Sequence, residues 1–520
     1  MSPRPSRADR RGANVFFPVG ILPAVEGGQC IPVAVCSGCF RPAPADQIAM
    51  TFRRLSDVPG PTGLAAQYSL FRRRLEMGEV LREISQQHGD VARVPILGAP
   101  KVLLSHPEDI QEVLATKAAA FRLFSQNLLR KLFPWGVVAT EGPVHDENRA
   151  HLVLAMRKVL SRRVPELTLR KCRQGLSSFQ EGQVVDLYEL TRQVTLAMSA
   201  AMLFPSEAEH LLLGQIDQEA FLRIVSNVNG WFLGIPTTLQ KLVLLAQLPH
   251  TLKIMRLRRR VKGQLRETIQ KVQAMKTGGP PADVLTLLTE GSEVGGPMPA
   301  EFLTDNLMNL LLAGYETTAN VMAWAMWEAA HREEVQTHLA REGSRLSPDP
   351  EQNIEWINNS PWTDATIQEA LRMYPSGWAL ARQSLFEFRL RDYLFERGTV
   401  FITSQWVTHR DTRWFPQPGR FLPERWLDGS SQLAETSAAA TGTGEDPPPR
   451  EKRHPFAFFP FGGGKRFCLG KAIFDFEGAL LLGSLFREWR LEPVEGCHPR
   501  PRFYATMLPD RQPLVVLRRR

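Results

Sequence analysis

The chain has 520 residues, of which 43% are hydrophobic and 22% charged, and its formal net charge is +9. This is the balance of an ordinary globular protein, so it excludes a mainly disordered or fibrous chain. The six cysteines are sparse and widely spaced, which excludes the disulfide framework of a small secreted domain.

The first 50 residues predict a variable, disordered leader ahead of the folded protein. Their apolar segment, residues 15–25, is interrupted by Pro18 and Pro23. It is too short for a transmembrane helix, which needs about 20 apolar residues. Basic residues precede the segment, so a processed targeting signal is the alternative. The CxxC pair Cys36–Cys39 lacks the four ligands of a structural zinc site, and we assign it no role.

The remaining elements follow in chain order. Apolar runs at residues 91–98 and 101–106 flank a Gly-Ala-Pro turn and predict a β-hairpin. From Phe302 to about Ala330, apolar residues recur in steps of three and four on nearly every side, which predicts a long buried helix. A second helix ends before Pro375, and a third begins after Gly470. The Ser-, Thr-, Gly- and Pro-rich segment 429–450 predicts a flexible surface insert.

One cysteine stands out by its setting. Cys468 lies between the glycines at 462–464 and an apolar helix. A helix N-terminus favours the thiolate form of a cysteine, and consecutive glycines let a flat ligand approach the backbone closely. The residues alone leave open a buried structural cysteine that follows a glycine turn.

The full pattern Phe461-x-x-Gly464-x-Arg466-x-Cys468-x-Gly470 resembles the heme-binding signature of the cytochrome P450 family. The resemblance implies that Cys468 is the axial thiolate ligand of the iron in heme b (iron protoporphyrin IX). It also implies that the neighbouring positions contact the cofactor: Pro460, Phe461, Gly462, Arg466 and Gly470.

A second motif lies midway along the predicted long helix. The run Ala313-Gly314-Tyr315-Glu316-Thr317-Thr318 is similar to the family's oxygen-activation motif. An acid and a hydroxyl in an apolar helix are costly unless they are used or paired, and Thr317 can donate to the carbonyl of Ala313. The resemblance implies that Glu316 and Thr317 are catalytic and deliver protons during activation of the co-substrate O2, with Ala313 against the heme.

Two further sets complete the resemblance, in family order. Glu369 and Arg372 match the ExxR pair, and Arg425 matches its partner, although Trp426 stands where the family usually has Phe. This triad is implied to be structural. The heme propionates need charge-assisted partners, and the resemblance assigns that role to His145, Arg149, Arg382 and Arg466.

The resemblance implies a mainly α fold with a small β-rich subdomain, in a single cytochrome P450 domain over residues 51–520. The function implied is a heme-thiolate monooxygenase of the soluble bacterial type. It would hydroxylate or epoxidise a hydrophobic small molecule such as a fatty acid, terpenoid, steroid or polyketide-like compound. The substrate-facing candidates are Ala313, Thr317, Trp378, Leu380 and residues 121–135 and 227–233.

No reductase segment follows Cys468, so we expect electrons from a ferredoxin or flavodoxin and its NAD(P)H reductase. The candidate docking residues are cationic: Lys452, Arg453, Lys465, Arg466 and Lys471. We expect no nucleic-acid partner, no transmembrane anchor and a cytoplasmic location. Residues 239–262 are apolar and then basic, which leaves open a peripheral membrane contact beside a role as the rim of the substrate channel.

Two other functions remain open from the sequence. A peroxide-dependent or isomerising heme-thiolate enzyme would need no electron donor, and a non-catalytic heme sensor would need no proton delivery. The presence of both Glu316 and Thr317 favours the monooxygenase.

Overall fold

The structure is a computed structural model, and it describes residues 52–96, 100–124, 130, 133–205, 248–274, 283–291, 296–427 and 453–520. The predicted leader, the 429–450 insert, residues 227–233 and the CxxC pair lie outside these residues. No helix within the described ranges is long and apolar enough to cross a membrane.

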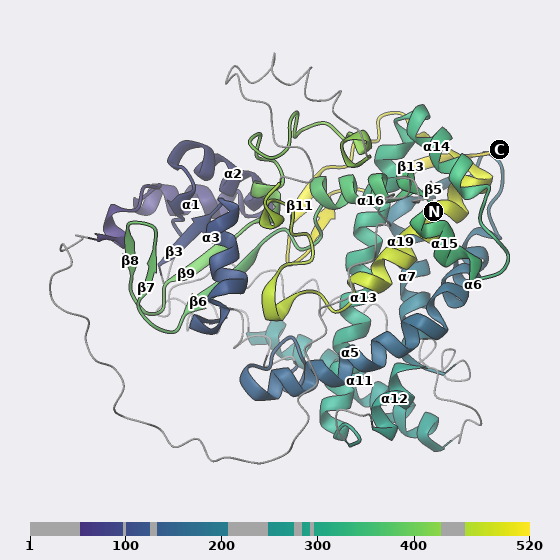
Figure 1. The fold of residues 1–520 in the computed structure, drawn as a ribbon, viewed down its shortest axis with the longest axis horizontal. Helices are drawn as coiled ribbons and strands as arrows, with labels where there is room; N and C mark the ends of the chain where they lie inside the picture. The colour runs from purple at the N-terminus through teal and green to yellow at the C-terminus, as the bar shows by residue number, and fades with distance from the viewer. Residues whose placement is uncertain are drawn as a thin grey trace, which may run out of the picture. The chain divides into compact units, whose positions relative to one another are not determined.

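Helices dominate the described chain (Figure 1). Their bounds are α1 Gly63–Arg72, α2 Met77–His88, α3 Pro107–Gln111, α5 Gly142–Arg162, α6 Val164–Leu176, α7 Leu187–Leu203, α11 Leu248–Ala274, α12 Val284–Glu290, α13 Ala300–Ala330, α14 Glu333–Gly343, α15 Gln352–Asn358, α16 Pro361–Met373, α17 Gln405–Thr408 and α19 Lys471–Glu488.

The strands are short, with bounds β1 Arg53–Arg54, β2 Val91–Arg93, β3 Lys101–Leu104, β4 Phe121–Leu123, β5 Val184–Asp186, β6 Leu380–Ser384, β7 Phe388–Leu390, β8 Tyr393–Phe395, β9 Val400–Thr403, β10 Trp489–Pro493, β11 Pro501–Phe503, β12 Met507–Pro509 and β13 Leu514–Arg519. The largest sheet has the order β2-β3-β9-β6-β4. Its β3 and β9 pair in parallel, with Lys101 opposite Val400. The sequence therefore predicted the fold class correctly: helices with small sheets.

Figure 1 shows α1, α2, α3 and strands β3, β6, β7, β8 and β9 on one side, and the long helices on the other. The loop that precedes α19 lies between these two groups. The predicted hairpin is present as antiparallel β2 and β3, but β2 ends at Arg93, two residues before Pro95, which has no N–H to give to a ladder.

The long helix α13 is the axis of the helical part. Its apolar residues face all sides, as the sequence predicted, so packed neighbours must cover nearly its whole length. It packs against α7, α16 and α19, and Trp324 stacks on Tyr374 at the end of α16 with 4.2 Å between ring centroids. Because α13 is fixed from several sides, the motif at its centre has a rigid support.

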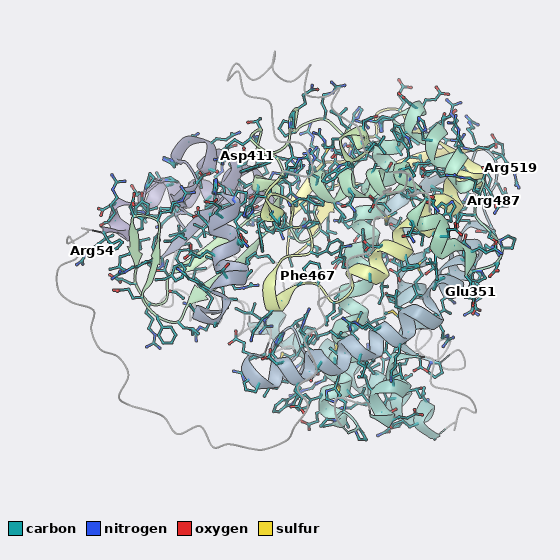
Figure 2. All side chains as sticks on the ribbon, in the orientation of Figure 1. Arg54, Glu351, Asp411, Phe467, Arg487 and Arg519 are labelled. Atoms are coloured by element: carbon teal, nitrogen blue, oxygen red, sulfur yellow. The ribbon has the colours of Figure 1, made fainter. Side chains whose placement is uncertain are left out.

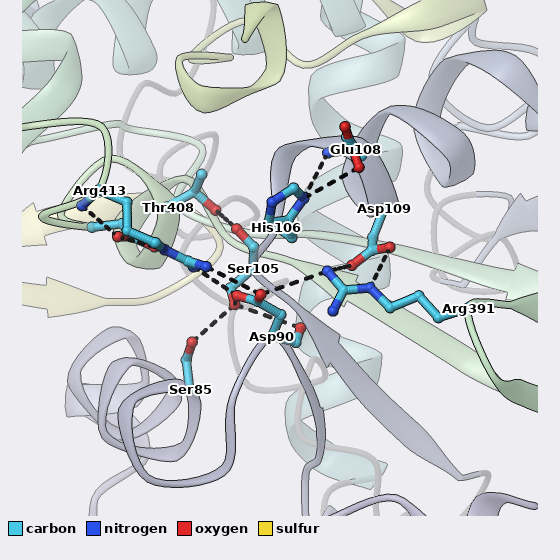
Figure 3. Close-up of polar contacts among 10 residues, drawn as sticks. Ser85, Asp90, Ser105, His106, Glu108, Asp109, Arg391, Thr408 and Arg413 are labelled. Atoms are coloured by element: carbon cyan, nitrogen blue, oxygen red, sulfur yellow. Dashed lines mark hydrogen bonds and ion pairs between the residues drawn. The ribbon is translucent and has the colours of Figure 1, made fainter. Parts of the chain in front are cut away.

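The β-rich side is joined to the loop after α17 by a cluster of charges around Asp90 (Figure 3). Both carboxylate oxygens of Asp90 accept hydrogen bonds from Arg413, at 2.6 and 3.1 Å. Arg391 lies 3.5 Å from Asp90 and 2.8 Å from Asp109. Burial alone would raise the pKa of Asp90, but Arg413 and Arg391 outweigh it and lower the pKa. The cluster therefore stabilises this junction in its ionised form.

One helical glycine marks a close approach between distant elements. A Cβ on Gly78 in α2 would lie 2.2 Å from the Phe503 ring, and that ring is held by Trp378 and Trp406. We predict that Gly78→Ala lowers the free energy of unfolding by about 1–3 kcal/mol, because the added methyl overpacks the contact.

The matched control is Gly263→Ala in α11, where an added Cβ meets nothing within 4 Å. This variant should be stabilised, by up to about 1 kcal/mol, because alanine favours a helix interior more than glycine does. Denaturant unfolding measures both. Equal effects of the two substitutions would contradict the packing argument.

Candidate functional site

The loop that presents Cys468 is shaped by glycines. Gly462 and Gly464 adopt positive φ angles of 73° and 63°. A Cβ on Gly464 would lie 2.2 Å from the carbonyl oxygen of Leu114, so this position requires glycine. The Cys468 amide donates to the Phe461 carbonyl at 3.0 Å and closes the turn, which leads into α19.

The thiol of Cys468 is exposed although protein atoms crowd its surroundings. Burial by those atoms raises its pKa, and the opposing effects of the Gly470 and Lys471 amides and of Arg149 reduce the rise without cancelling it. A protein thiol with a raised pKa becomes a thiolate when it ligates a metal cation. By contrast, Cys172 is fully buried in the core.

Side-chain burial is interrupted at the centre of α13. Ala313 is exposed and Thr317 half-buried, whereas Tyr315, Glu316 and Thr318 are buried. The Thr317 hydroxyl donates to the Ala313 carbonyl at 2.6 Å. Such a bond to the preceding turn competes with the helix's own hydrogen bonds. One face of the motif therefore lines an open space, and the other belongs to the core.

Glu316 lies on the core side of that motif. Its side chain reaches the turn between β11 and β12, where the Thr506 hydroxyl donates to its Oε1 at 3.5 Å. Burial raises the pKa of Glu316 to about 7, against opposing effects of Thr506 and Arg192. The carboxyl can therefore gain or lose a proton near neutral pH.

Three guanidinium groups gather near the Cys468 loop. Arg149 donates to the Phe467 carbonyl at 2.8 Å, and Arg466 donates to the carbonyls of Val137 and Thr140 at 3.3 and 2.5 Å. The hydrogen bond of Arg382 runs to the carbonyl of Ala381, at 3.1 Å. Figure 2 marks Phe467 on this loop, between the β-rich side and the long helices.

None of these three arginines makes an ion pair with a described residue. Burial and, to a smaller extent, nearby Arg466 lower the pKa of Arg382 to about 10, against an opposing effect of Glu141. Half-buried cations that repel one another are stabilised by an anion, and carboxylates match guanidinium geometry. The cluster therefore has the chemistry of a site for a ligand with carboxylate groups.

His145 lies next to this cluster. It is buried, and its Nδ1 is 3.1 Å from Asp146 Oδ1. Burial lowers its pKa, and Arg466 and Arg149 lower it further, against an opposing effect of Asp146. The imidazole is therefore neutral at neutral pH. It can donate and accept hydrogen bonds without adding a positive charge to the arginine cluster.

Glu369 is the centre of a buried polar cluster. Arg372 donates to both of its oxygens, at 2.9 and 2.8 Å, and Arg425 donates at 3.0 Å. The Trp426 indole N–H donates at 2.8 Å, which a phenylalanine could not do. Burial alone would raise the pKa of Glu369, but the two guanidinium groups outweigh it and lower the pKa to about 2.

The same arginines hold the chain that leads to Cys468. Arg372 donates to the carbonyls of His409, Pro418 and Arg420 at 2.9–3.0 Å. The ring of buried His409 then accepts at Nε2 from the Phe459 amide at 3.0 Å. Glu369 is thus joined through Arg372 and His409 to the start of the Cys468 loop.

The other residues predicted to contact heme or substrate differ in burial and position. Trp378 is buried in the core, and its indole donates to the Tyr504 carbonyl at 2.7 Å. Leu380 is half-buried and begins β6, close to Gly462. Pro460 and Phe461 are half-buried in the loop itself.

Most of the cations predicted to form the docking patch have contacts within the protein. Arg466 stays only a prediction as a docking residue, and its guanidinium is engaged by the carbonyls of Val137 and Thr140. Arg453 lies over the rings of Phe415 and Trp426, and Lys471 pairs with Asp475 at 2.6 Å. Lys465 is well exposed and lies 3.7 Å from the exposed carboxylate of Asp146. Lys452 lies outside the described residues.

Sequence reasoning missed three residues of the site. No local pattern marks Thr506, because the hairpin brings it to Glu316 from 190 positions away. The role of His409 is equally non-local. Trp426 was noticed as a departure, but a side-chain hydrogen bond was not inferred from its indole.

The residues present fit a heme. Cys468 offers an exposed soft sulfur ligand just ahead of a helix, and the three arginines lack carboxylate ion-pair partners among the described residues. Sulfur ligation by cysteine is one of the established ways to hold heme iron.

Comparisons with known proteins identify the family and the fold. A model of the cytochrome P450 family matches residues 58–516. Cyclooctatin synthase of Streptomyces melanosporofaciens is 26% identical over 479 residues, 89% of this chain and 95% of that protein. The mitochondrial 25-hydroxyvitamin D-1 alpha hydroxylase of Homo sapiens is 32% identical over 220 residues, 41% of this chain and 39% of that protein. The crystal structure of the cytochrome P450DA heme domain has a TM-score of 0.73 at 17% identity, covering 90% of this chain and 98% of that one.

The Trp426 contact gives a testable prediction. Trp426→Phe should lower the free energy of unfolding by about 1–3 kcal/mol, because the buried Glu369 oxygen loses a hydrogen bond. Trp414→Phe is the matched control, since its indole N–H has no described hydrogen-bond partner. Denaturant unfolding of both variants measures the difference, and equal losses would refute a role for the Trp426 N–H.

Proposed function

The chain belongs to the cytochrome P450 family and is a monooxygenase, and from this membership we propose how its own residues perform the reaction. When bound, the heme supplies reductive activation of O2 and insertion of one oxygen atom into the substrate. The observation that carries the proposal is the cluster of Cys468 with three arginines that have no ion-pair partner among the described residues.

Cys468 would ligate the iron of the heme as thiolate. The N–H groups of Gly470 and Lys471 lower the pKa of the thiol, so they stabilise negative charge on sulfur and tune the electron density that it donates. Because Gly464 fits only without a side chain, the loop keeps one geometry. The sulfur is therefore positioned before the cofactor arrives.

Arg149, Arg382 and Arg466 would bind the two carboxylates of the heme, with neutral His145 as a further hydrogen-bonding group. Their partial burial makes each charge-assisted bond stronger than it would be in water. Binding also relieves the repulsion between Arg382 and Arg466. Heme affinity and the order of this region are therefore coupled.

Glu316 and Thr317 divide the proton handling between the two faces of α13. Glu316, whose pKa is about 7, holds the proton on the core side. Thr317 lies on the open side and can donate or accept at its hydroxyl. Ordered water would complete the relay, and the exposed Ala313 leaves room on the face where O2 and substrate bind.

The substrate is a hydrophobic small molecule, of the fatty acid, terpenoid, steroid or polyketide-like class. Apolar Ala313 and Leu380 support this class. Hydroxylation is supported by a relative named as a hydroxylase. Electrons come from a separate ferredoxin or flavodoxin with its NAD(P)H reductase, and exposed Lys465 is the docking cation that remains best supported.

The ligand assignment predicts a spectrum. The reduced, carbon monoxide-bound protein should show the red-shifted Soret band of thiolate ligation. Cys468→Ala should lose that band, while Cys497→Ala, which also removes a free thiol, should keep it. Retention of the band in Cys468→Ala would refute the ligand assignment. Turnover with peroxide alone equal to turnover with NAD(P)H, ferredoxin and reductase would refute the external-donor proposal.

The proton assignment predicts a pH dependence. The protonated fraction of Glu316 falls as the pH rises through about 7, so product formation should decline above that pH. Glu316→Gln should lower turnover by roughly 10²-fold, the lower end for general acid catalysis, and should remove this decline. Product per NAD(P)H consumed is measured across pH.

Glu477→Gln is the matched control for that experiment. Burial raises the pKa of Glu477 to about 8, but this residue belongs to α19 and has no role in the proposed relay. Its variant should keep the wild-type profile. An unchanged profile in Glu316→Gln would remove Glu316 from the relay.

A further inference from the structure

The loop of residues 133–140 connects helix α13 to the loop that presents Cys468. On one side, the Val137 amide donates to Asn306 Oδ1 in α13 at 2.8 Å. On the other side, the Val137 carbonyl accepts a hydrogen bond from Arg466 at 3.3 Å. A single residue of the 133–140 loop is therefore bonded both to the helix of the oxygen-activation motif and to the Cys468 loop.

Asn306 is buried, with 0% exposure, and it uses both ends of its side-chain amide. While its Oδ1 holds Val137, its Nδ2 donates to Asn148 Oδ1 in α5 at 3.2 Å. Asn148 in turn donates to the Trp135 carbonyl at 3.0 Å. Asn306 therefore fixes the 133–140 loop directly at Val137 and indirectly at Trp135.

The neighbouring Asp305 holds the same loop through a charge. The Trp135 amide donates to Asp305 Oδ2 at 3.0 Å. Lys262 of α11 forms an ion pair with Asp305 Oδ1, so the charge of this buried carboxylate is compensated within the protein. The 133–140 loop is therefore held on α13 by contacts that involve no ligand.

Gly136 brings this loop close to α13. A Cβ on Gly136 would lie 2.6 Å from Asn309 Oδ1. The Gly136 carbonyl accepts from the Thr140 amide and hydroxyl at 3.1 and 3.2 Å, which holds Thr140 in the turn. The Thr140 carbonyl is the second acceptor for Arg466, at 2.5 Å. The position of the loop on α13 therefore determines where both acceptors of Arg466 lie.

We propose that Asn306 is a positioning residue for the heme, because it fixes Arg466 through the 133–140 loop. This inference rests on the proposed function, which assigns Arg466 to a heme carboxylate. Since Arg466 makes no ion pair with a described residue, the two loop carbonyls set the direction of its guanidinium. Its other N–H groups serve the carboxylate. Asn306 acts through the loop and does not itself bind the cofactor.

The test measures the rate of heme loss from the holoenzyme to excess apomyoglobin and the reduction potential of the heme iron. Arg466→Gln should accelerate heme loss roughly 10-fold or more, because a hydrogen bond between charged groups is lost. Asn306→Leu should accelerate it roughly 3–10-fold, because Arg466 remains but is less fixed. Both variants should lower the reduction potential, since weaker compensation of the carboxylates disfavours an added electron.

The double variant Asn306→Leu/Arg466→Gln shows whether Asn306 acts through Arg466. Its rate of heme loss should equal that of Arg466→Gln, because residues that act through one network have non-additive effects. If the two effects instead multiply, Asn306 acts independently of Arg466 and the proposal is overturned.

Asn353→Leu is the matched control. Asn353 is also 0% exposed and also holds a loop, because it accepts from the Ser347 amide and donates to the Ser347 carbonyl, both at 3.0 Å. It belongs to α15, and Figure 2 shows Glu351, which precedes that helix, far from Phe467. The control should lose stability to denaturant but keep the wild-type rate of heme loss and reduction potential.

The outcomes separate failure of this proposal from failure of the proposed function. Faster heme loss in Arg466→Gln with wild-type values in Asn306→Leu would overturn the positioning role alone. Wild-type heme loss in Arg466→Gln would overturn the carboxylate assignment, and the positioning role with it. Equal acceleration in Asn353→Leu and Asn306→Leu would identify general destabilisation as the cause and would also overturn the positioning role.

Discussion

The buried carboxylate of Glu369 fixes the chain around the site. An ionised group without exposure to water is costly, and removal of one partner of such a pair typically costs about 3–5 kcal/mol. Arg372, Arg425 and Trp426 compensate the charge. Because Arg372 also binds three backbone carbonyls, the same interaction determines the course of residues 409–420. Cys468 has a defined position partly because this distant acid is satisfied.

The two faces of the motif segment of helix α13 differ: one face packs in the core, and the other is open to a ligand. Hydroxyls of Thr191 and Thr195 on α7 donate to the carbonyls of Ala319 and Tyr315 at 2.9 and 2.8 Å, which holds the core side of the motif. The other side presents Ala313 and the Thr317 hydroxyl. If both faces of the motif were packed, no ligand could reach it. Without the α7 contacts, the position of α13 relative to α7 would be less fixed.

The sequence predicted those parts of the site whose signal is local. The glycine loop around Cys468, the acid and hydroxyl in α13, and the three-residue spacing of Glu369 and Arg372 each lie within one short segment. Contacts that depend on tertiary folding were not predictable: Thr506 on Glu316, the Phe459 amide on His409, and the inward direction of Arg466. Trp378 shows the same limit, since an aromatic residue near the site was read as a substrate contact and packs in the core.

The parallel pairing of β3 with β9 has a consequence for synthesis. Lys101 lies opposite Val400, 299 positions later, and closing so long a loop is entropically unfavourable until most of the domain is available. At roughly 5–20 residues per second, the ribosome needs about 15–60 seconds to deliver the partner strand. During that interval the hydrogen-bonding edge of β3 is open to incorrect pairing, so the nascent β2–β3 hairpin is exposed to aggregation and to chaperone binding.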